Sequence, residues 1–287
     1  MALNVLITGS NSGLGLVTAT TFARAGHKVH ASLRNLARAG ALEAARASGL
    51  PIEILALDVT DDRSARAAVV QTNADAPIDV LVNNAGFGVS GPIELVSDAN
   101  LRRQFDTNVF GMARMIRLVA PSMRARGRGT IINISSISGL VAGPFTGAYS
   151  ASKHAVEALS QALWFELRPF GVRVVLIEPG GFPTDFDSNI VSEAGWAENS
   201  PYGALANRLK AAEDAGGTPQ QDPQVVADLI VQAATSENPK LRYLAGGDAQ
   251  MLAPLYRSLD FEAFVSVMVD RLGLGDVLRP PGSELLT

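Results

Sequence analysis

The chain has 287 residues, 47% of them hydrophobic and 18% charged, and its 24 basic and 28 acidic residues give a net charge of −4. This length allows a sizeable core. The charge balance provides no basic surface for binding nucleic acid. The absence of cysteine excludes disulfides, thiol catalysis and Cys-ligated metal sites, and we expect no metal site. No apolar run reaches the ~20 residues of a membrane span, and the first strand leaves no room for a signal peptide, so we expect a cytoplasmic protein.

Strands and helices are predicted to alternate from residue 4 to about residue 245. An apolar strand at 4–8 leads into a helix at 13–25, which Gly26 ends. The predicted strands then follow at 28–32, 52–57, 79–83, 130–135, 172–178 and 241–245, and the helices at about 35–48, 61–74, 98–125, 148–168 and 223–235. Strand 172–178 is apolar almost throughout, which indicates burial on both faces. The pattern predicts a single doubly wound α/β domain with a seven-stranded parallel sheet flanked by helices.

Residues 180–222 lose this periodicity, and irregular stretches of such length are more often functional lids than structural connections. Two short helical segments at about 248–272 end the pattern. We therefore divide the chain into a main unit at 1–247, which includes a substrate lid at 180–222, and a helical C-terminal extension at 248–287 packed on the same domain. The extension would either roof a pocket or obstruct a subunit contact.

A glycine-rich turn joins the first strand to the first helix, where the sequence from Thr8 to Gly15 is TGSNSGLG. Glycines at this position let the backbone approach a pyrophosphate while the N–H groups of the helix face it. A simple chain reversal is the alternative. We assign to this cofactor contact Gly9, Ser10, Asn11, Ser12, Gly13, Leu14 and Gly15.

Arg34 follows the second strand, where folds of this kind face the adenosine ribose. An acidic side chain would bind the ribose hydroxyls of NAD, whereas an arginine suits the 2′-phosphate of NADP by charge and geometry. The sequence thus favours NADP(H), with NAD the less expected cofactor. A solvated arginine at the start of a helix is the alternative.

The ends of the third and fourth strands carry further candidates for the cofactor site. Asp58, followed by Val59, would either bind the adenine amino group or cap the next helix. Asn84, Ala85 and Gly86 follow the fourth strand, at the edge of the sheet where the ligand crevice belongs.

Tyr149 and Lys153 are four residues apart, which places them on one face of the predicted helix 148–168. A tyrosine titrates near pH ~10 and is a poor base at neutrality, but a fixed cation close by would lower its pKa. On its own the pair could equally belong to a solvated helix face. With the other motifs present, a tuned tyrosine that donates and accepts a proton becomes the leading catalytic hypothesis.

The glycine turn, Asn83-Asn84-Ala85-Gly86 and Tyr149-x-x-x-Lys153 resemble the short-chain dehydrogenase/reductase family, over roughly residues 3–247. Segments such as Asn133-Ile134-Ser135-Ser136 look most like its compact 17β-hydroxysteroid-dehydrogenase-like reductases, which have a Rossmann-like fold. The resemblance implies a catalytic tetrad of Asn108, Ser136, Tyr149 and Lys153. In it the tyrosine is the general acid/base, the serine donates a second hydrogen bond to the carbonyl oxygen, the lysine lowers the tyrosine pKa, and the asparagine seats a water.

The same resemblance extends the cofactor site to the loop after the sixth strand. It implies that Pro179, Gly180, Phe182 and Thr184 contact the nicotinamide end, together with the tetrad residues Asn108, Tyr149 and Lys153. Pro183 stands where relatives often have arginine, which leaves the contacts of this loop open.

Apolar and aromatic side chains in the segments that should border the pocket predict an apolar carbonyl or alcohol substrate, such as a steroid, terpenoid or aryl ketone. The residues assigned to this pocket are Phe87, Ser136, Ser138, Phe145, Tyr149, Phe182, Phe186 and Trp196. The arginine-bearing helix 98–125 is either a subunit contact, as the resemblance implies, or a solvated face. We expect a homo-dimer or homo-tetramer.

The function predicted from these residues is that of an NADP(H)-dependent oxidoreductase. The alternative is a non-catalytic NADP(H)-binding sensor or scaffold, although members of that kind usually lose the tyrosine or the lysine. A nucleotide-sugar epimerase or dehydratase is disfavoured by the glycine spacing.

Overall fold

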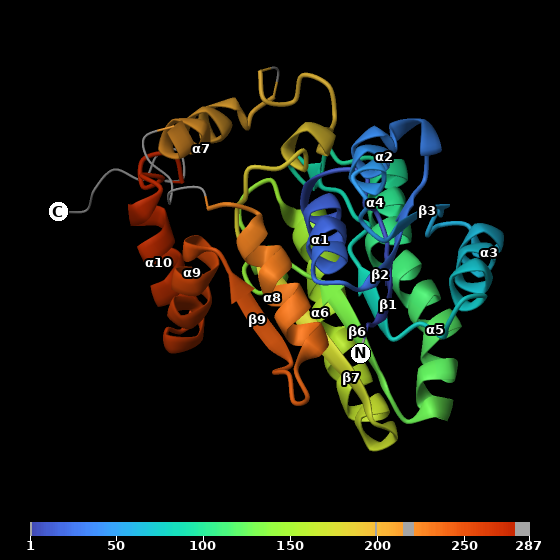
Figure 1. Ribbon diagram of the computed structural model, residues 1–287. Helices are drawn as coiled ribbons and strands as arrows, with labels where there is room; N and C mark the ends of the chain where they lie inside the picture. Colours follow the sequence, from blue (N-terminus) through green and yellow to red (C-terminus); the bar gives the residue numbers. More distant parts are fainter. Residues whose placement is uncertain (1, 199, 215–220, 279–287) are drawn as a thin grey trace.

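The computed structural model describes residues 2–198, 200–214 and 221–278. Its seven-stranded sheet is parallel throughout, with the strand order β3-β2-β1-β4-β6-β7-β9 (Figure 1). The predicted doubly wound sheet is thereby confirmed. Its strands are β1 (Asn4–Ile7), β2 (Lys28–Leu33), β3 (Ile52–Ala56), β4 (Val80–Asn83), β6 (Gly129–Ile134), β7 (Val172–Pro179) and β9 (Arg242–Ala245).

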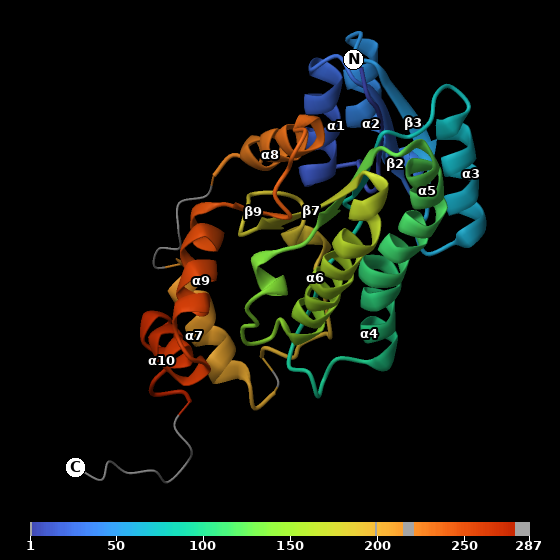
Figure 2. The same cartoon turned by 90° about the horizontal axis from the view of Figure 1, so that it is seen from below.

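Each strand contributes alternate side chains to two separate cores, because successive residues of a strand point to opposite faces. Val5 and Ile7 of β1 belong to the core on one face, whereas Leu6 belongs to the core on the other. Figures 1 and 2 show the resulting three layers. The first core is covered by α1 (Gly13–Arg24), α2 (Gly40–Ala47) and α8 (Gln224–Thr235), and the second by α3 (Asp62–Asn73), α5 (Met112–Arg126) and α6 (Gly147–Leu167).

The strand order changes direction between β1 and β4, since β2 and β3 lie on one side of β1 and the later strands on the other. The carboxyl ends of β1 and β4 therefore diverge into connections on opposite faces. In doubly wound sheets, ligands bind in the crevice at such a switch point.

The predicted helix 98–125 is in fact interrupted. It consists of α4 (Asp98–Phe105), a π-helical turn at Asp106–Gly111, and α5. Gly111 lies so close to the third strand's loop that a Cβ there would be 2.7 Å from Val59 Cγ2. The extra residue of a π turn shifts the register of the helix face, and sequence periodicity does not reveal it.

The segment 180–222 is more regular than predicted. Val191–Ser192 forms a short strand, β8, that pairs in parallel with β5 (Val89–Ser90), and α7 (Gly203–Asp214) follows. The two predicted C-terminal helices are α9 (Gly247–Ser258) and α10 (Phe261–Arg271). Both views place α7 beside them (Figures 1 and 2). Parts of the proposed lid and extension, at 199, 215–220 and 279–287, lie outside the described residues.

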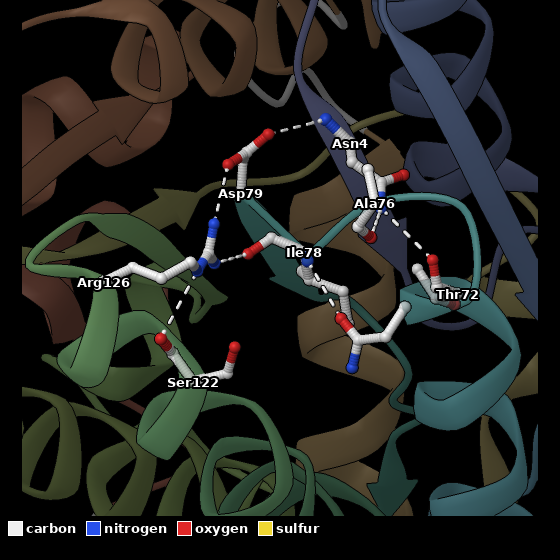
Figure 3. Close-up of polar contacts among 8 residues, drawn as sticks. Asn4, Thr72, Ala76, Ile78, Asp79, Ser122 and Arg126 are labelled. Atoms are coloured by element: carbon white, nitrogen blue, oxygen red, sulfur yellow. Dashed lines mark hydrogen bonds and ion pairs between the residues drawn. The ribbon is translucent and has the colours of Figure 1, made fainter.

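A polar network closes the amino-terminal edge of the sheet (Figure 3). Asp79 accepts hydrogen bonds from Asn4 N at 3.1 Å and from Arg126 Nη1 at 3.1 Å. The same guanidinium donates to the Ile78 carbonyl oxygen and to the Ser122 carbonyl oxygen at 3.4 Å. These contacts hold β1, β4 and the end of α5 together. Among the described residues, no helix has the length and apolarity to cross a membrane.

Candidate active site

The glycine-rich turn after β1 is closely packed at the carboxyl edge of the sheet. Gly9 and Gly13 have φ of +70° and +53°, conformations that suit glycine. A Cβ on Gly15 would overlap the Gly9 carbonyl oxygen, and a Cβ on Gly9 would lie 2.8 Å from Ala85 Cα. Each of these glycines is therefore needed for a close approach of backbone segments.

Thr8 and Asn84 hold this turn in place. Thr8 Oγ1 accepts hydrogen bonds from Asn84 N at 3.0 Å and Ala85 N at 2.9 Å. The Asn84 side chain donates to the carbonyl oxygens of Thr8 at 3.0 Å and Gly9 at 2.8 Å. Asn84 was predicted to contact the cofactor, but its amide group is engaged by the turn itself.

The start of α1 presents backbone donors at the turn. Its N-cap residue, Ser12, has an extended backbone and makes no capping hydrogen bond through its side chain. Because the first N–H groups of a helix lack intrahelical partners and carry the positive end of the dipole, this end of α1 suits a phosphate group.

A polar cavity of about 220 Å³ lies next to this turn at the end of β2. It is lined by Asn11, Leu33, Arg34, Asn35 and Arg38. The structure thus brings predicted Arg34 together with predicted Asn11, and adds a second guanidinium that the sequence analysis missed. The signal for Arg38 was its spacing of four residues from Arg34, but the backbone there forms a 3₁₀ turn at Leu36–Arg38 instead of the start of a long helix.

Neither Asp58 nor Val59 caps the helix that follows them. Asp58 Oδ1 accepts hydrogen bonds from Thr60 N and Oγ1 at 2.9 and 2.7 Å, whereas Asp61 caps α3. The capping alternative for Asp58 was therefore wrong. The Val59 side chain is buried in the core under α3 and α5, so only its backbone could face a ligand.

Tyr149 and Lys153 lie near the start of α6 and share one face, as predicted. The Lys153 Nζ is 5.7 Å from the centroid of the tyrosine ring and donates a 2.7 Å hydrogen bond to the Ile134 carbonyl oxygen. Burial raises the pKa of Tyr149 to about 12, and the Ser136 hydroxyl opposes this rise. Burial lowers the pKa of Lys153 to about 8, against the attraction of Glu157. The expected lowering of the tyrosine pKa by the lysine is not found, because burial dominates and the Ser136 hydroxyl is the group that opposes it.

Ser136 lies two residues after β6, next to this pair. Its Oγ accepts a hydrogen bond from Ser138 N at 3.1 Å and donates to the Pro179 carbonyl oxygen at 3.4 Å. Ser136 therefore joins the ends of β6 and β7 at the site, and Ser138 acts on it through its backbone.

Asn108, in the π turn, has a fully engaged amide. Its Nδ2 donates to Phe87 O at 3.0 Å and Ser152 Oγ at 3.1 Å, and its Oδ1 accepts from Phe87 N at 3.2 Å. One helical turn earlier, buried Gln104 donates to Phe87 O at 2.7 Å and accepts from Val89 N at 2.6 Å. The two amides clamp one backbone segment, and the role of Gln104 was not predicted.

Behind Lys153 lies a buried cluster of charged groups that sequence reasoning also missed. Arg242 of β9 contacts Glu157 at 3.1 Å and Glu178 at 3.1 Å. Burial raises the pKa of Glu178 to about 7, with Glu157 adding to the rise and Arg242 opposing it. Arg242 lies in the predicted strand 241–245, and only the tertiary fold brings it to the two carboxylates.

Aromatic side chains in the segments assigned to the pocket form two pairs, one of which includes Tyr149. The ring of Phe186 lies 5.5 Å from that of Tyr149, and Trp196 lies 4.5 Å from Phe145. Phe145 has φ of +62°, and no other non-glycine residue in the described ranges has a positive φ. Such conformations cost energy in a bulky residue and are concentrated at functional sites.

One residue assigned to the pocket, Phe182, lies elsewhere. Phe182 is 8% exposed and packs in the core between the sheet and α8, because β9 and Gly246 leave space for its ring. The ring of Phe87 lies 4.7 Å from the guanidinium of Arg103, on α4. The prediction that the Phe182 ring lines the pocket differs from the structure for this reason.

The loop after β7 reaches the glycine turn. Thr184 lies 3.4 Å from the position of a Cβ on Gly13, and its Oγ1 accepts a hydrogen bond from Phe186 N. Gly180 N donates to the Ala245 carbonyl oxygen at 2.8 Å. The loop therefore connects the turn to the aromatic residues beside Tyr149.

Comparison with known proteins shows which family and which relatives the chain resembles. Residues 3–195 match a family model described as short chain dehydrogenase. The chain is 41% identical over 274 residues to "Uncharacterized oxidoreductase YusZ" of Bacillus subtilis, covering 93% of this chain and 97% of that protein. It is 36% identical over 268 residues to human 17-beta-hydroxysteroid dehydrogenase type 1, covering 88% and 79%.

Solved structures resemble the fold over most of the chain. A short-chain dehydrogenase from Streptomyces avermitilis has a TM-score of 0.76 and 32% identity, covering 96% of this chain and 98% of that one. A gluconate 5-dehydrogenase from Burkholderia cenocepacia, in complex with NADP and tartrate, has a TM-score of 0.71 and 27% identity, covering 86% and 94%.

Proposed function

The chain belongs to the short-chain dehydrogenase family, and from this premise we propose that it interconverts a ketone or aldehyde with an alcohol, using NADP(H) and Tyr149 as general acid/base. Membership makes the chain an oxidoreductase, in agreement with the resemblance found in the sequence. The further claims, on cofactor preference, on residue roles and on the substrate, are proposals.

The observation that carries the proposal is the convergence of Tyr149, Lys153 and Ser136 next to the glycine turn. Thr184 packs on Gly13, and Phe186 packs on the Tyr149 ring. Segment 184–186 therefore links the glycine turn to the phenol ring.

The chain's own groups fit a dinucleotide with a 2′-phosphate. The glycine turn leaves no side chain in the way of a pyrophosphate, and the start of α1 presents uncapped donors. Arg34 and Arg38 line the polar cavity beside the turn, which suits an additional phosphate. Relatives of known structure include an NADP complex. When bound, the nicotinamide would supply or accept the hydride.

The phenol of Tyr149 is the proton donor for carbonyl reduction. With a pKa of about 12 it is protonated at neutral pH, and Ser136 is close enough to act on the same oxygen of a substrate. With a pKa of about 8, the Lys153 ammonium is largely charged at pH 7 and stabilises the phenolate that remains after the transfer.

Asn108 contributes to the proposed site by holding neighbouring groups in place. Since both amide hydrogens are bonded to protein groups, its side chain holds the segment at Phe87 and the Ser152 hydroxyl in place. A water relay, as the resemblance implied, would use backbone groups of the π turn.

The proposed substrate is a small apolar carbonyl compound or alcohol. Phe186 packs against the phenol ring, and Phe145 and Trp196 form a second aromatic pair that we assign to the same pocket. The name of the human relative refers to a steroid, which agrees with such a pocket.

We also propose that the chain forms a homo-dimer or homo-tetramer. Exposed Phe110, Leu159 and Phe165 lie on the π turn and α6, two elements in contact with each other. A second copy would cover this apolar surface. Light scattering after size-exclusion chromatography measures the subunit number, and a monomer at all concentrations would contradict the proposal.

The proposed function is tested by titrating the purified chain with NADPH and NADH by fluorescence, followed by turnover assays with steroid, aryl and aliphatic ketones. We expect tighter binding of NADPH and oxidation of NADPH by an apolar ketone. Equal or tighter binding of NADH would contradict the role of Arg34. Tight binding without turnover across the panel would favour a cofactor sensor.

A further inference from the structure

The loop after β7 is fastened to the start of α9 through one carboxylate. Gly181 N donates a 2.7 Å hydrogen bond to Asp248 Oδ2, and Ala249 N donates a 2.8 Å hydrogen bond to Asp248 Oδ1. Both oxygens of the side chain therefore accept from backbone N–H groups. One of these groups belongs to the proposed cofactor loop and the other to the C-terminal helix.

Glycines create the space that this carboxylate occupies. A Cβ on Gly180 would overlap the Asp248 side chain, and a Cβ on Gly246 would lie 2.8 Å from Oδ1. Gly246 also has φ of +97°, a conformation that disfavours other residues. The Asp248 carboxylate thus fits closely between Gly246, its near neighbour in the sequence, and Gly180, which the fold brings to it.

The fastened loop connects two parts of the active site. At its start, the Pro179 carbonyl oxygen accepts the hydrogen bond from Ser136 Oγ at 3.4 Å. Five residues later, Thr184 packs on Gly13 of the nucleotide turn. A shift of Gly181 would therefore move both the serine that acts on Tyr149 and the residue that touches the turn.

We propose that Asp248 is a positioning residue that sets the place of loop 179–184, and thereby the affinity for the nicotinamide end of the cofactor. This inference rests on the proposed function, because it takes that loop to be a cofactor contact. Asp248 touches neither the reacting atoms nor the proposed proton donor. It acts on them through Gly181 and Ser136.

Asp248→Asn tests this role with little change in volume. An asparagine has one acceptor oxygen, so its NH₂ group would face one of the two backbone donors. Leaving such a donor unpaired weakens the clamp by an amount that corresponds to roughly tenfold in an equilibrium constant. We expect the Kd and KM for NADPH to rise about tenfold, while kcat at saturating NADPH changes less than about threefold.

Asp260→Asn is the matched control. Asp260 also begins a C-terminal helix, where its Oδ1 accepts a 2.8 Å hydrogen bond from Ala263 N, but it contacts no part of the loop. This substitution removes the same charge at the start of a helix and retains an oxygen that can accept from Ala263 N. We expect it to leave the Kd for NADPH unchanged.

Hydrogen exchange without cofactor measures the clamp directly. Peptides that cover 180–186 should exchange faster in Asp248→Asn than in the wild type or Asp260→Asn. If Asp248→Asn does not fold, as judged by circular dichroism, Asp248→Ser, which retains one shorter acceptor, takes its place.

The outcomes separate this inference from the proposed function. A wild type that binds NADPH, together with an Asp248→Asn variant of unchanged Kd or unchanged exchange, would overturn the positioning role alone. A wild type that binds neither NADPH nor NADH would overturn the proposed function and the positioning role with it.

Discussion

The polar and charged groups at the two edges of the sheet differ in how far their hydrogen bonds are satisfied and in how far their pKa values are shifted. At the amino-terminal edge, both oxygens of Asp79 and three nitrogens of Arg126 are bonded to neighbouring groups (Figure 3). The carboxyl edge instead buries Tyr149 and Lys153 where desolvation moves both pKa values towards the neutral forms. It also contains the π turn and the positive φ of Phe145.

This difference shows where the fold is stabilised and where it can react. A satisfied ion pair has little left to offer a ligand, since its donors and acceptors are already used. A buried phenol and ammonium with shifted pKa values are less stable locally, and such groups are concentrated at active sites. Substitutions at the carboxyl edge should therefore lower activity, and substitutions at the amino-terminal edge should lower stability.

The largest effect is expected from Tyr149→Phe at the carboxyl edge. Loss of the proton donor should reduce kcat about 10²- to 10⁴-fold, while the Kd for NADPH and the melting temperature change little. Ketone reduction assays and cofactor titration measure both properties. Tyr202→Phe, which removes a hydroxyl that donates to Glu94 at 2.7 Å, is the control. Wild-type turnover in Tyr149→Phe would remove the tyrosine from the mechanism.

The second effect concerns the polar cavity beside the glycine turn. Arg34→Ala and Arg38→Ala should each weaken NADPH binding about 10- to 100-fold, because each removes a charge-assisted hydrogen bond to phosphate. NADH binding should change less than about twofold. Fluorescence titration with both cofactors measures the ratio. Equal losses for NADPH and NADH would assign these arginines a structural role instead.

The third effect tests the amino-terminal edge. Asp79→Ala leaves the guanidinium of Arg126, 20% exposed, without its carboxylate, and we expect a loss of about 1–3 kcal/mol in the free energy of unfolding. Asp62→Ala is the control, since Asp62 forms a solvent-exposed pair with Arg66 and its loss should change the stability less. Urea denaturation gives the stability, and kcat should be unchanged in both. A drop in kcat without loss of stability would break the contrast between the edges.

The smallest effect is a pH dependence of stability from Glu178. The folded-state pKa of about 7 lies above the unfolded value of 4.5, so ionisation is harder in the folded chain. Stability should therefore fall as pH rises from about 4.5 to 7. Glu178→Gln should abolish this fall and leave the Arg242 contact with Glu157 in place. Urea denaturation at pH 5 and pH 8 measures the difference. Equal pH dependence in the variant and the wild type would contradict it.

Local patterns in the sequence predicted the parts of the molecule that local physics determines. Apolar strands, helical periodicity and stop signals at glycine predicted the positions of the strands and helices and the parallel, doubly wound sheet. The turn at Gly9 and the spacing of Tyr149 and Lys153 depend on a few neighbouring residues. These features could be predicted because each is specified within a short segment.

The features that escaped prediction all depend on contacts between distant segments. The π turn at Asn108 follows from the approach of Gly111 to Val59, and Arg242 meets Glu157 only across the folded sheet. The pKa of Tyr149 depends on burial, which spacing alone does not give. The Phe182 ring entered the core because β9 and α8 surround it, a packing that no motif at residue 182 reveals.

The contact between Gly181 and Asp248 also sets an order of events during synthesis. These residues are 67 positions apart, and β9 must first pair with β7. At a translation rate of about 5–20 residues per second, the loop would wait roughly 3–13 s on the ribosome for its carboxylate. A nascent chain can thus build most of the sheet early, yet it completes the cofactor loop only when its last strand has emerged.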